Sequence, residues 1–192
     1  MELKEIMTEP WTPSDSVIDL MDSICEPMQC KRGQLLVTQG KRSHDFFIIK
    51  EGLCRSFYNG EKYEDTNLFA KDGDIIGSIA SYFRGEPAYF SIEALTALDV
   101  LKVSFEDLRK AIAENSELSA WVRDLLFGQL NALERRYTYR SGRGDAYYRY
   151  VSMIEKWPHK RFNDIPLKHI AQYLQITPQM LSKIRRRYLS EK

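Results

Sequence analysis

The C-terminal segment over residues 165–188 holds the side chains whose types and spacing most clearly indicate chemistry. Four residues share one face of a first short helix: Leu167, Ile170, Ala171 and Leu174. Leu181, Ile184 and Tyr188 share a face of a second helix, and Ile176 falls in the turn between them. Two short helices with a small residue at their crossing are typical of a helix-turn-helix, because the two backbones approach closely there. Residues 165–188 are therefore predicted to form a helix-turn-helix.

The outward residues of the second helix fit the recognition of duplex DNA. Thr177 is expected to cap this helix and Pro178 to occupy its first turn. Glutamine pairs with adenine, lysine and arginine pair with guanine, and further basic residues contact phosphates. Gln175 stands where a glycine is usual, so it must adopt a left-handed conformation at some cost. The candidate DNA-binding residues are Lys168, Thr177, Gln179, Ser182, Lys183, Arg185, Arg186 and Arg187.

The charge distribution also indicates a polyanionic partner for the C-terminal end. The net charge of +1 divides into −9 over residues 1–134, with 14 basic and 23 acidic residues, and +10 over residues 135–192, with 14 basic and 4 acidic residues. A basic end meets nucleic acid, an anionic membrane surface or an acidic protein. Charge alone does not choose among these, and a regulatory module that contacts protein or membrane stays open as an alternative.

Composition and residue counts argue against most enzyme classes. The 192 residues are 43% hydrophobic and 29% charged, and they show no apolar run of transmembrane length and no secretory leader, so a cytoplasmic globular protein is expected. Three cysteines fall short of the four thiolates of an iron–sulfur cluster, and one histidine in the β-rich region falls short of a metalloenzyme site. No P-loop or nucleophile motif is present. No catalysis, metal or cofactor is predicted, and a β-roll metal enzyme remains the weaker rival.

The first two thirds of the chain change from a helical to a β-rich pattern. A helix is expected after Ser14 or Asp15, and short β-rich runs punctuated by glycine fill residues 28–103. Asn59–Gly60 indicates a hairpin between the β-rich runs on either side of it, because both residues tolerate positive φ. Ser104 is expected to cap the next helix. Short strands at this spacing predict a sandwich or barrel, and hence an α+β protein.

A long helix is predicted over residues 117–140. One apolar stripe of this helix is expected to pack against the rest of its own domain, and it consists of Leu118, Val122 and Leu125. A second stripe, of Leu126, Leu130, Leu133 and Tyr137, is left for a partner helix and predicts dimerisation. The glycines at 142 and 144 indicate a hinge over Arg140–Asp145. The expected domains are an effector-sensing β-roll with its N-terminal helix (1–116), a dimerisation helix (117–140) and a DNA-binding domain (145–192).

The order of these elements resembles the cyclic-AMP receptor protein/fumarate-nitrate regulator (Crp/Fnr) superfamily of bacterial transcription factors. The resemblance runs from about residue 15 and is carried by Arg32–Gly40, Phe46–Gly52, Asp72–Gly77 and Ile165–Arg187. It implies a homodimer joined through the long helix, palindromic operator DNA, contact with RNA polymerase and an effector pocket in the β-roll. Similar regulators continue past the second helix into a β-hairpin wing, whereas this sequence stops eight residues after Ile184.

The resemblance breaks down at the residues that would bind a cyclic nucleotide. Members that bind one have Glu after the glycine at position 77 and an Arg-Ser or Arg-Thr pair eleven residues past it; here these positions hold Ser78 and Ala88–Tyr89. Without the guanidinium, a buried phosphate loses its charge-assisted hydrogen bonds. Cyclic-nucleotide binding is therefore not expected, and the effector is unknown. The candidate pocket residues are Ser78, Ile79, Tyr82, Arg84, Ala88, Tyr89, Phe90, Glu134 and Arg135.

Overall fold

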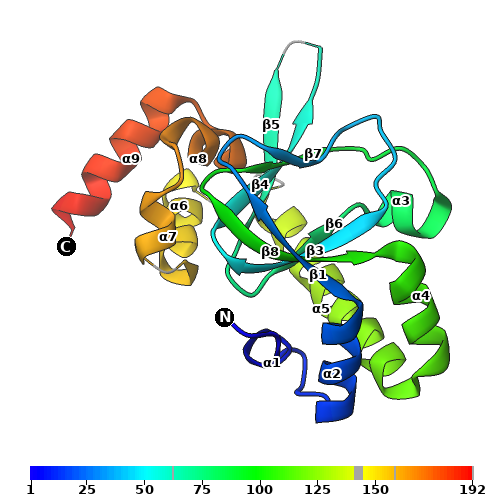
Figure 1. Ribbon diagram of the computed structural model, residues 1–192. Helices are drawn as coiled ribbons and strands as arrows, with labels where there is room; N and C mark the ends of the chain where they lie inside the picture. Colours follow the sequence, from blue (N-terminus) through cyan, green and yellow to red (C-terminus); the bar gives the residue numbers. More distant parts are fainter. Residues whose placement is uncertain (62, 141–144, 158, 192) are drawn as a thin grey trace.

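The computed structural model describes residues 1–61, 63–140, 145–157 and 159–191, and it confirms the α+β class (Figure 1). The strands are β1 (Cys25–Cys30), β2 (Leu35–Val37), β3 (Asp45–Glu51), β4 (Leu53–Asn59), β5 (Glu64–Lys71), β6 (Ile75–Gly77), β7 (Ser91–Ala94) and β8 (Leu98–Ser104). The helices are α1 (Leu3–Ile6), α2 (Asp15–Ile24), α3 (Ile79–Arg84), α4 (Phe105–Glu114), α5 (Ser116–Arg140), α6 (Ala146–Lys156), α7 (His159–Asn163), α8 (Leu167–Leu174) and α9 (Pro178–Ser190).

The strands form a β-roll of two four-stranded antiparallel sheets. One sheet has the order β1-β8-β3-β6 and the other the order β2-β7-β4-β5. Side chains alternate between the two faces of each strand, so in β3 Phe47 and Ile49 enter the core between the sheets while Ile48 points to the opposite face. Cys30 and Cys54 lie in the same inner core.

The hairpin predicted at Asn59–Gly60 is confirmed as the antiparallel pair β4 and β5, although its connection is longer than a two-residue turn. Asn59 is the last residue of β4 and pairs with Glu64, the first residue of β5, so the connection begins at Gly60 and is longer than two residues. The Gly60 N–H donates to the carbonyl oxygen of Tyr63 at 2.9 Å. Gly60 does not have positive φ. The longer connection relieves both residues of the left-handed conformation that a two-residue turn requires.

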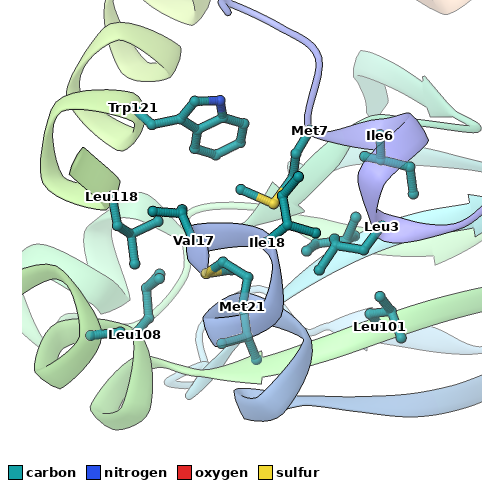
Figure 2. Close-up of a cluster of buried hydrophobic side chains, with 13 residues drawn as sticks. Leu3, Ile6, Met7, Val17, Ile18, Met21, Leu101, Leu108, Leu118 and Trp121 are labelled. Carbon is teal, nitrogen blue, oxygen red and sulfur yellow. The ribbon is translucent and has the colours of Figure 1, made fainter. Parts of the chain in front are cut away.

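The N-terminal helices and α4 pack against α5 and the outer face of the β1-β8-β3-β6 sheet. Figure 2 shows Trp121 and Leu118 of α5 facing Val17, Ile18 and Met21 of α2. The Trp121 indole N–H donates to the carbonyl oxygen of Trp11 at 2.9 Å. Val122 and Leu125 lie against the same cluster, which confirms the stripe of α5 that was predicted to serve its own domain. The short helix α1 was not predicted.

The helices α6–α9, called here the C-terminal helices, pack on the outer face of the other sheet. Leu53, Phe69 and Leu95 of the β-roll share one buried cluster with side chains from α6, α8 and α9. Figure 1 shows these helices on one side of the roll, with α2 and α4 on the other. Nothing in the residue spacing predicted this contact or the helix α7. The glycine-containing hinge segment 141–144 lies outside the described residues.

Candidate functional site

The pair α8 and α9 has the close packing that the sequence predicts. Ile170, Leu174, Leu181 and Ile184 are buried between the helices, and Ala171 is only 2% exposed at the crossing. Ile176 and Tyr188 are partly buried against the same cluster. Leu167 was also predicted to be buried, but its exposed fraction is 46%. Leu167 is the first residue of α8.

The turn between the two helices is fixed by backbone geometry and by a side-chain cap. Gln175 adopts φ 53° and ψ 48°, the left-handed conformation expected for it. Its exposed side chain therefore sits on a backbone that suits glycine better. The Met180 N–H donates to the hydroxyl oxygen of Thr177 at 3.1 Å, and Pro178 lies in the first turn of α9. Both features of the predicted helix start are thus present.

The outward edge of α9 presents polar and cationic side chains to solvent. Gln179, Lys183 and Arg186 are exposed, and so is Lys168 on α8. Ser182 is exposed as well, but its hydroxyl donates to the carbonyl oxygen of Pro178 at 3.0 Å. None of Gln179, Lys183 and Arg186 has a side-chain hydrogen bond or ion pair to another described residue. They are available to an external anion or to hydrogen-bonding bases.

Two arginines of α9 that are among the predicted DNA-binding residues are engaged within the chain. The Arg187 guanidinium pairs with Glu191 at 2.7 Å and lies 3.9 Å from the ring centroid of Tyr147. Arg185 hydrogen-bonds the Tyr150 hydroxyl; burial raises the pKa of that phenol, and the arginine opposes the rise. In this arrangement both residues join α9 to α6. A phosphate contact from either would require its side chain to move.

The C-terminal half of α5 carries exposed apolar side chains that no described part of the chain covers. Phe127, Leu130 and Leu133 are 63%, 52% and 57% exposed. Leu126 is half-buried. The side chain of Tyr137, the last member of the predicted stripe, lies outside the described residues. Phe127 was missed in the sequence, although it stands three residues before Leu130, a spacing that places the two on neighbouring turns of one face.

A hollow of about 600 Å³ opens beside α3 and holds several of the predicted pocket residues. It is lined by Ser78, Ile79, Ala80, Phe83, Arg84, Glu86, Tyr89 and Phe90.

Three predicted pocket residues lie elsewhere. Tyr82 packs on Phe46 and Phe105, because the turns of α3 direct it toward the sheet. Ala88 is 2% exposed in the core of the roll, and Glu134 is exposed on α5. The side chain of Arg135 lies outside the described residues.

The polar groups of the hollow are already committed to neighbours in the chain. The Ser78 hydroxyl accepts from the Ser81 N–H at 3.2 Å and so caps α3. The Arg84 guanidinium lies 3.7 Å from one carboxylate oxygen of Glu86, and the other oxygen accepts from the Tyr89 hydroxyl. The remaining lining is mainly apolar and aromatic. This lining suits an apolar or aromatic ligand better than an exposed phosphate anion.

The cysteines are poor candidates for thiolate chemistry. Burial raises the pKa of the Cys25 thiol to about 11, and it also raises the pKa of the Cys30 and Cys54 thiols. All three are therefore protonated at neutral pH. Among the described residues, no three histidine, cysteine or acidic side chains are grouped as metal ligands. None of the helices in the described ranges is both long and apolar enough to span a membrane.

Comparison with known proteins identifies the β-roll. Residues 27–115 match the family described as the cyclic nucleotide-binding domain. No curated protein matches the chain significantly.

Several solved structures share the whole architecture. FixK2 from Bradyrhizobium japonicum superposes with a TM-score of 0.75 at 15% identity, covering 88% of this chain and 86% of its own. The c-di-GMP responsive global regulator CLP of Xanthomonas campestris gives 0.73 at 11% identity, covering 93% of both chains. A CooA mutant from Carboxydothermus hydrogenoformans gives 0.70 at 17% identity, covering 100% and 85%. Residues 27–115 thus match the cyclic nucleotide-binding domain family, and the chain shares the fold of these three solved structures.

Proposed function

We propose that this protein is a sequence-specific DNA-binding transcription regulator of the Crp/Fnr type. The observation that carries the proposal is the exposed edge of α9, where Gln179, Lys183 and Arg186 have no partner among the described residues. These side chains stand on a capped helix that is packed closely against α8. A helix-turn-helix of this kind places the N-terminal part of its second helix in the major groove.

The proposed roles follow from what each side chain can donate or accept. Gln179 pairs with adenine, and Lys183 donates to the acceptor atoms of guanine. Lys168 on α8 lies where a first helix crosses the DNA backbone, so we assign it to phosphate. Arg186 contributes positive charge on the same edge of α9. Because the Arg187 guanidinium lies over the Tyr147 ring of α6 and is paired with Glu191, we assign its main role to joining α6 and α9 rather than to DNA.

Binding as a homodimer is part of this proposal. Phe127, Leu130 and Leu133 form an apolar face on α5 that a second copy of α5 can cover. A two-fold dimer presents two α9 helices to DNA, and productive binding needs them about 34 Å apart, one helical turn. The operator is then palindromic. Contact with RNA polymerase is implied by the resemblance to the Crp/Fnr superfamily.

We infer that the β-roll senses something other than a cyclic nucleotide. Ser78 replaces the expected glutamate and is committed to capping α3, while Ala88 is buried and has no guanidinium. The hollow next to α3 instead favours a small apolar or aromatic molecule. Titration of the purified protein with cyclic AMP and cyclic GMP tests this; saturable binding of either in the micromolar range would contradict it.

The experiment that tests the DNA proposal is selection of bound duplexes from a random pool. The intact protein is expected to enrich one palindromic sequence, and Lys183→Ala is expected to lose preference at the base pairs that this lysine contacts. Lys110→Ala removes a charge that pairs with Glu106 on α4, and it serves as the matched control. Sequence-independent retention of DNA by the intact protein, or equal behaviour of all three proteins, would refute the proposal.

A further inference from the structure

The surface between the β-roll and the C-terminal helices contains a buried polar cluster around Arg55. This arginine points from β4 to the outer face of its sheet, yet it is only 3% exposed. Its guanidinium donates to Glu93 on β7 at 2.9 Å and to Glu64 on β5 at 2.7 Å, and the Thr66 hydroxyl oxygen lies 3.1 Å from Nη1. An arginine at this depth is retained only when its donors are satisfied.

The C-terminal helices complete this cluster. The Arg55 Nη1 atom lies 2.9 Å from Nδ1 of His169, which is buried on α8. A guanidinium has donors only, so Nδ1 is the acceptor and His169 is neutral in this contact. On the next turn of α8, the Gln172 side-chain oxygen accepts from the Thr66 hydroxyl at 2.9 Å. Side chains from β4, β5 and α8 are thus joined by direct hydrogen bonds.

A second ion pair joins the same two parts of the chain at a separate point. Arg161 of α7 donates from Nε and Nη2 to the two carboxylate oxygens of Asp72, at 2.9 Å and 2.8 Å. Asp72 also accepts from the Gly52 N–H at 2.6 Å. Burial alone would raise the pKa of Asp72, but these hydrogen bonds hold it below its usual value. Such bidentate pairs fix the relative orientation of the two groups.

We propose that these two clusters form a clasp that fixes the orientation of the C-terminal helices on the β-roll of the same chain. The clasp leaves Gln179, Lys183 and Arg186 exposed, so it directs the outward edge of α9 without covering it. Strands of the sensing domain then set the position of α9 directly, in addition to the covalent link through α5. The clasp depends on the proposed function at one point only, which is the assignment of α9 as the helix that reads DNA.

Hydrogen–deuterium exchange of the full chain without DNA tests the clasp independently of DNA binding. Arg161→Gln is expected to raise exchange at least tenfold in α7 and α8 and in β5, while β1, β3 and β8 stay unchanged. Asp72→Asn keeps an acceptor for Gly52 but removes the charge, and it is expected to give the same local pattern. The double variant should raise exchange no more than either single variant does, because both substitutions remove the same interaction.

Two variants of His169 separate a clasp from a merely well-packed surface. His169→Asn places an amide oxygen near the position of Nδ1 and is expected to keep protection of α8, whereas His169→Leu is expected to lose it. Lys110→Gln is the control for loss of a surface charge. Unchanged exchange in α8 and β5 for Arg161→Gln and His169→Leu would overturn the proposal, as would equal loss of protection throughout the roll.

Discussion

Replacement of Gln175 by glycine is expected to stabilise the protein. Gln175 is held at φ 53° and ψ 48° because its N–H closes the end of α8 on the carbonyl oxygens of Ala171 and Gln172. A left-handed conformation costs an L-residue roughly 1–2 kcal/mol. Glycine avoids this cost but loses more backbone entropy on folding, roughly 0.5–1 kcal/mol. Because the Gln175 side chain is exposed, little packing is lost, and the net gain is about 0.5–1 kcal/mol.

Urea unfolding followed by circular dichroism measures this difference. With a slope of about 2.5 kcal/mol per molar urea, Gln175→Gly should raise the midpoint by about 0.2–0.4 M. Gln175→Ala removes the same polar group but keeps a β-carbon, so its midpoint should stay near that of the unaltered protein. A lower midpoint for Gln175→Gly, or an equal gain for Gln175→Ala, would refute the reasoning from backbone conformation.

Four further predictions concern the dimer, the clasp, the roll and α5. Leu130→Asp should weaken self-association by about a hundredfold to ten-thousandfold, because burying a leucine contributes about 1.5–3 kcal/mol in each of two copies. Analytical ultracentrifugation measures the dissociation constant. Leu189→Asp, a substitution at another exposed leucine, should leave self-association unchanged. Burial lowers the pKa of His169 from 6.5, and Arg55 and Lys168 lower it further while Gln172 and Glu64 oppose them, so the unfolded chain binds more protons. Stability should therefore fall as the pH drops below about 6.5, and an identical pH profile for His169→Asn would contradict this. Gly52→Ala should cost about 2–6 kcal/mol in a denaturation curve, because φ is +121° and the new β-carbon would lie 2.6 Å from the Ala97 oxygen. Gly128→Ala, in open space on α5, should instead gain about 1 kcal/mol, and a loss there would count against the account of α5.

Local sequence signals predicted those elements whose stability is set by neighbours along the chain. The cap at Thr177, the bounds of α8 and the left-handed Gln175 all depend on residues within one or two turns. The inner stripe of α5 followed from helical periodicity in the same way. The hairpin at Asn59–Gly60 was also predicted, although the pairing of β4 with β5 extends through Asn59 and makes its connection longer than two residues.

Contacts between distant segments could not be predicted from spacing. In the sequence, Arg55 is one charged residue in an alternating strand and His169 is one polar residue in a short helix. Neither position carries a local signal of contact with the other. Their 2.9 Å contact exists only because α8 lies on β4 and β5. The hollow beside α3 is a second example. The sequence predicted that the segment around α3 lines it, but the inward orientation of Tyr82 and the burial of Ala88 depend on contacts with the sheet.

The central claim is that two copies of this chain read one DNA duplex through α9. The most direct measurement is the mass of the complex formed with the duplex recovered by selection, by native mass spectrometry or ultracentrifugation. Two chains per duplex are predicted, with protected half-sites centred about 34 Å apart. One chain per duplex, or a complex that forms equally well on unrelated sequences, would contradict the claim.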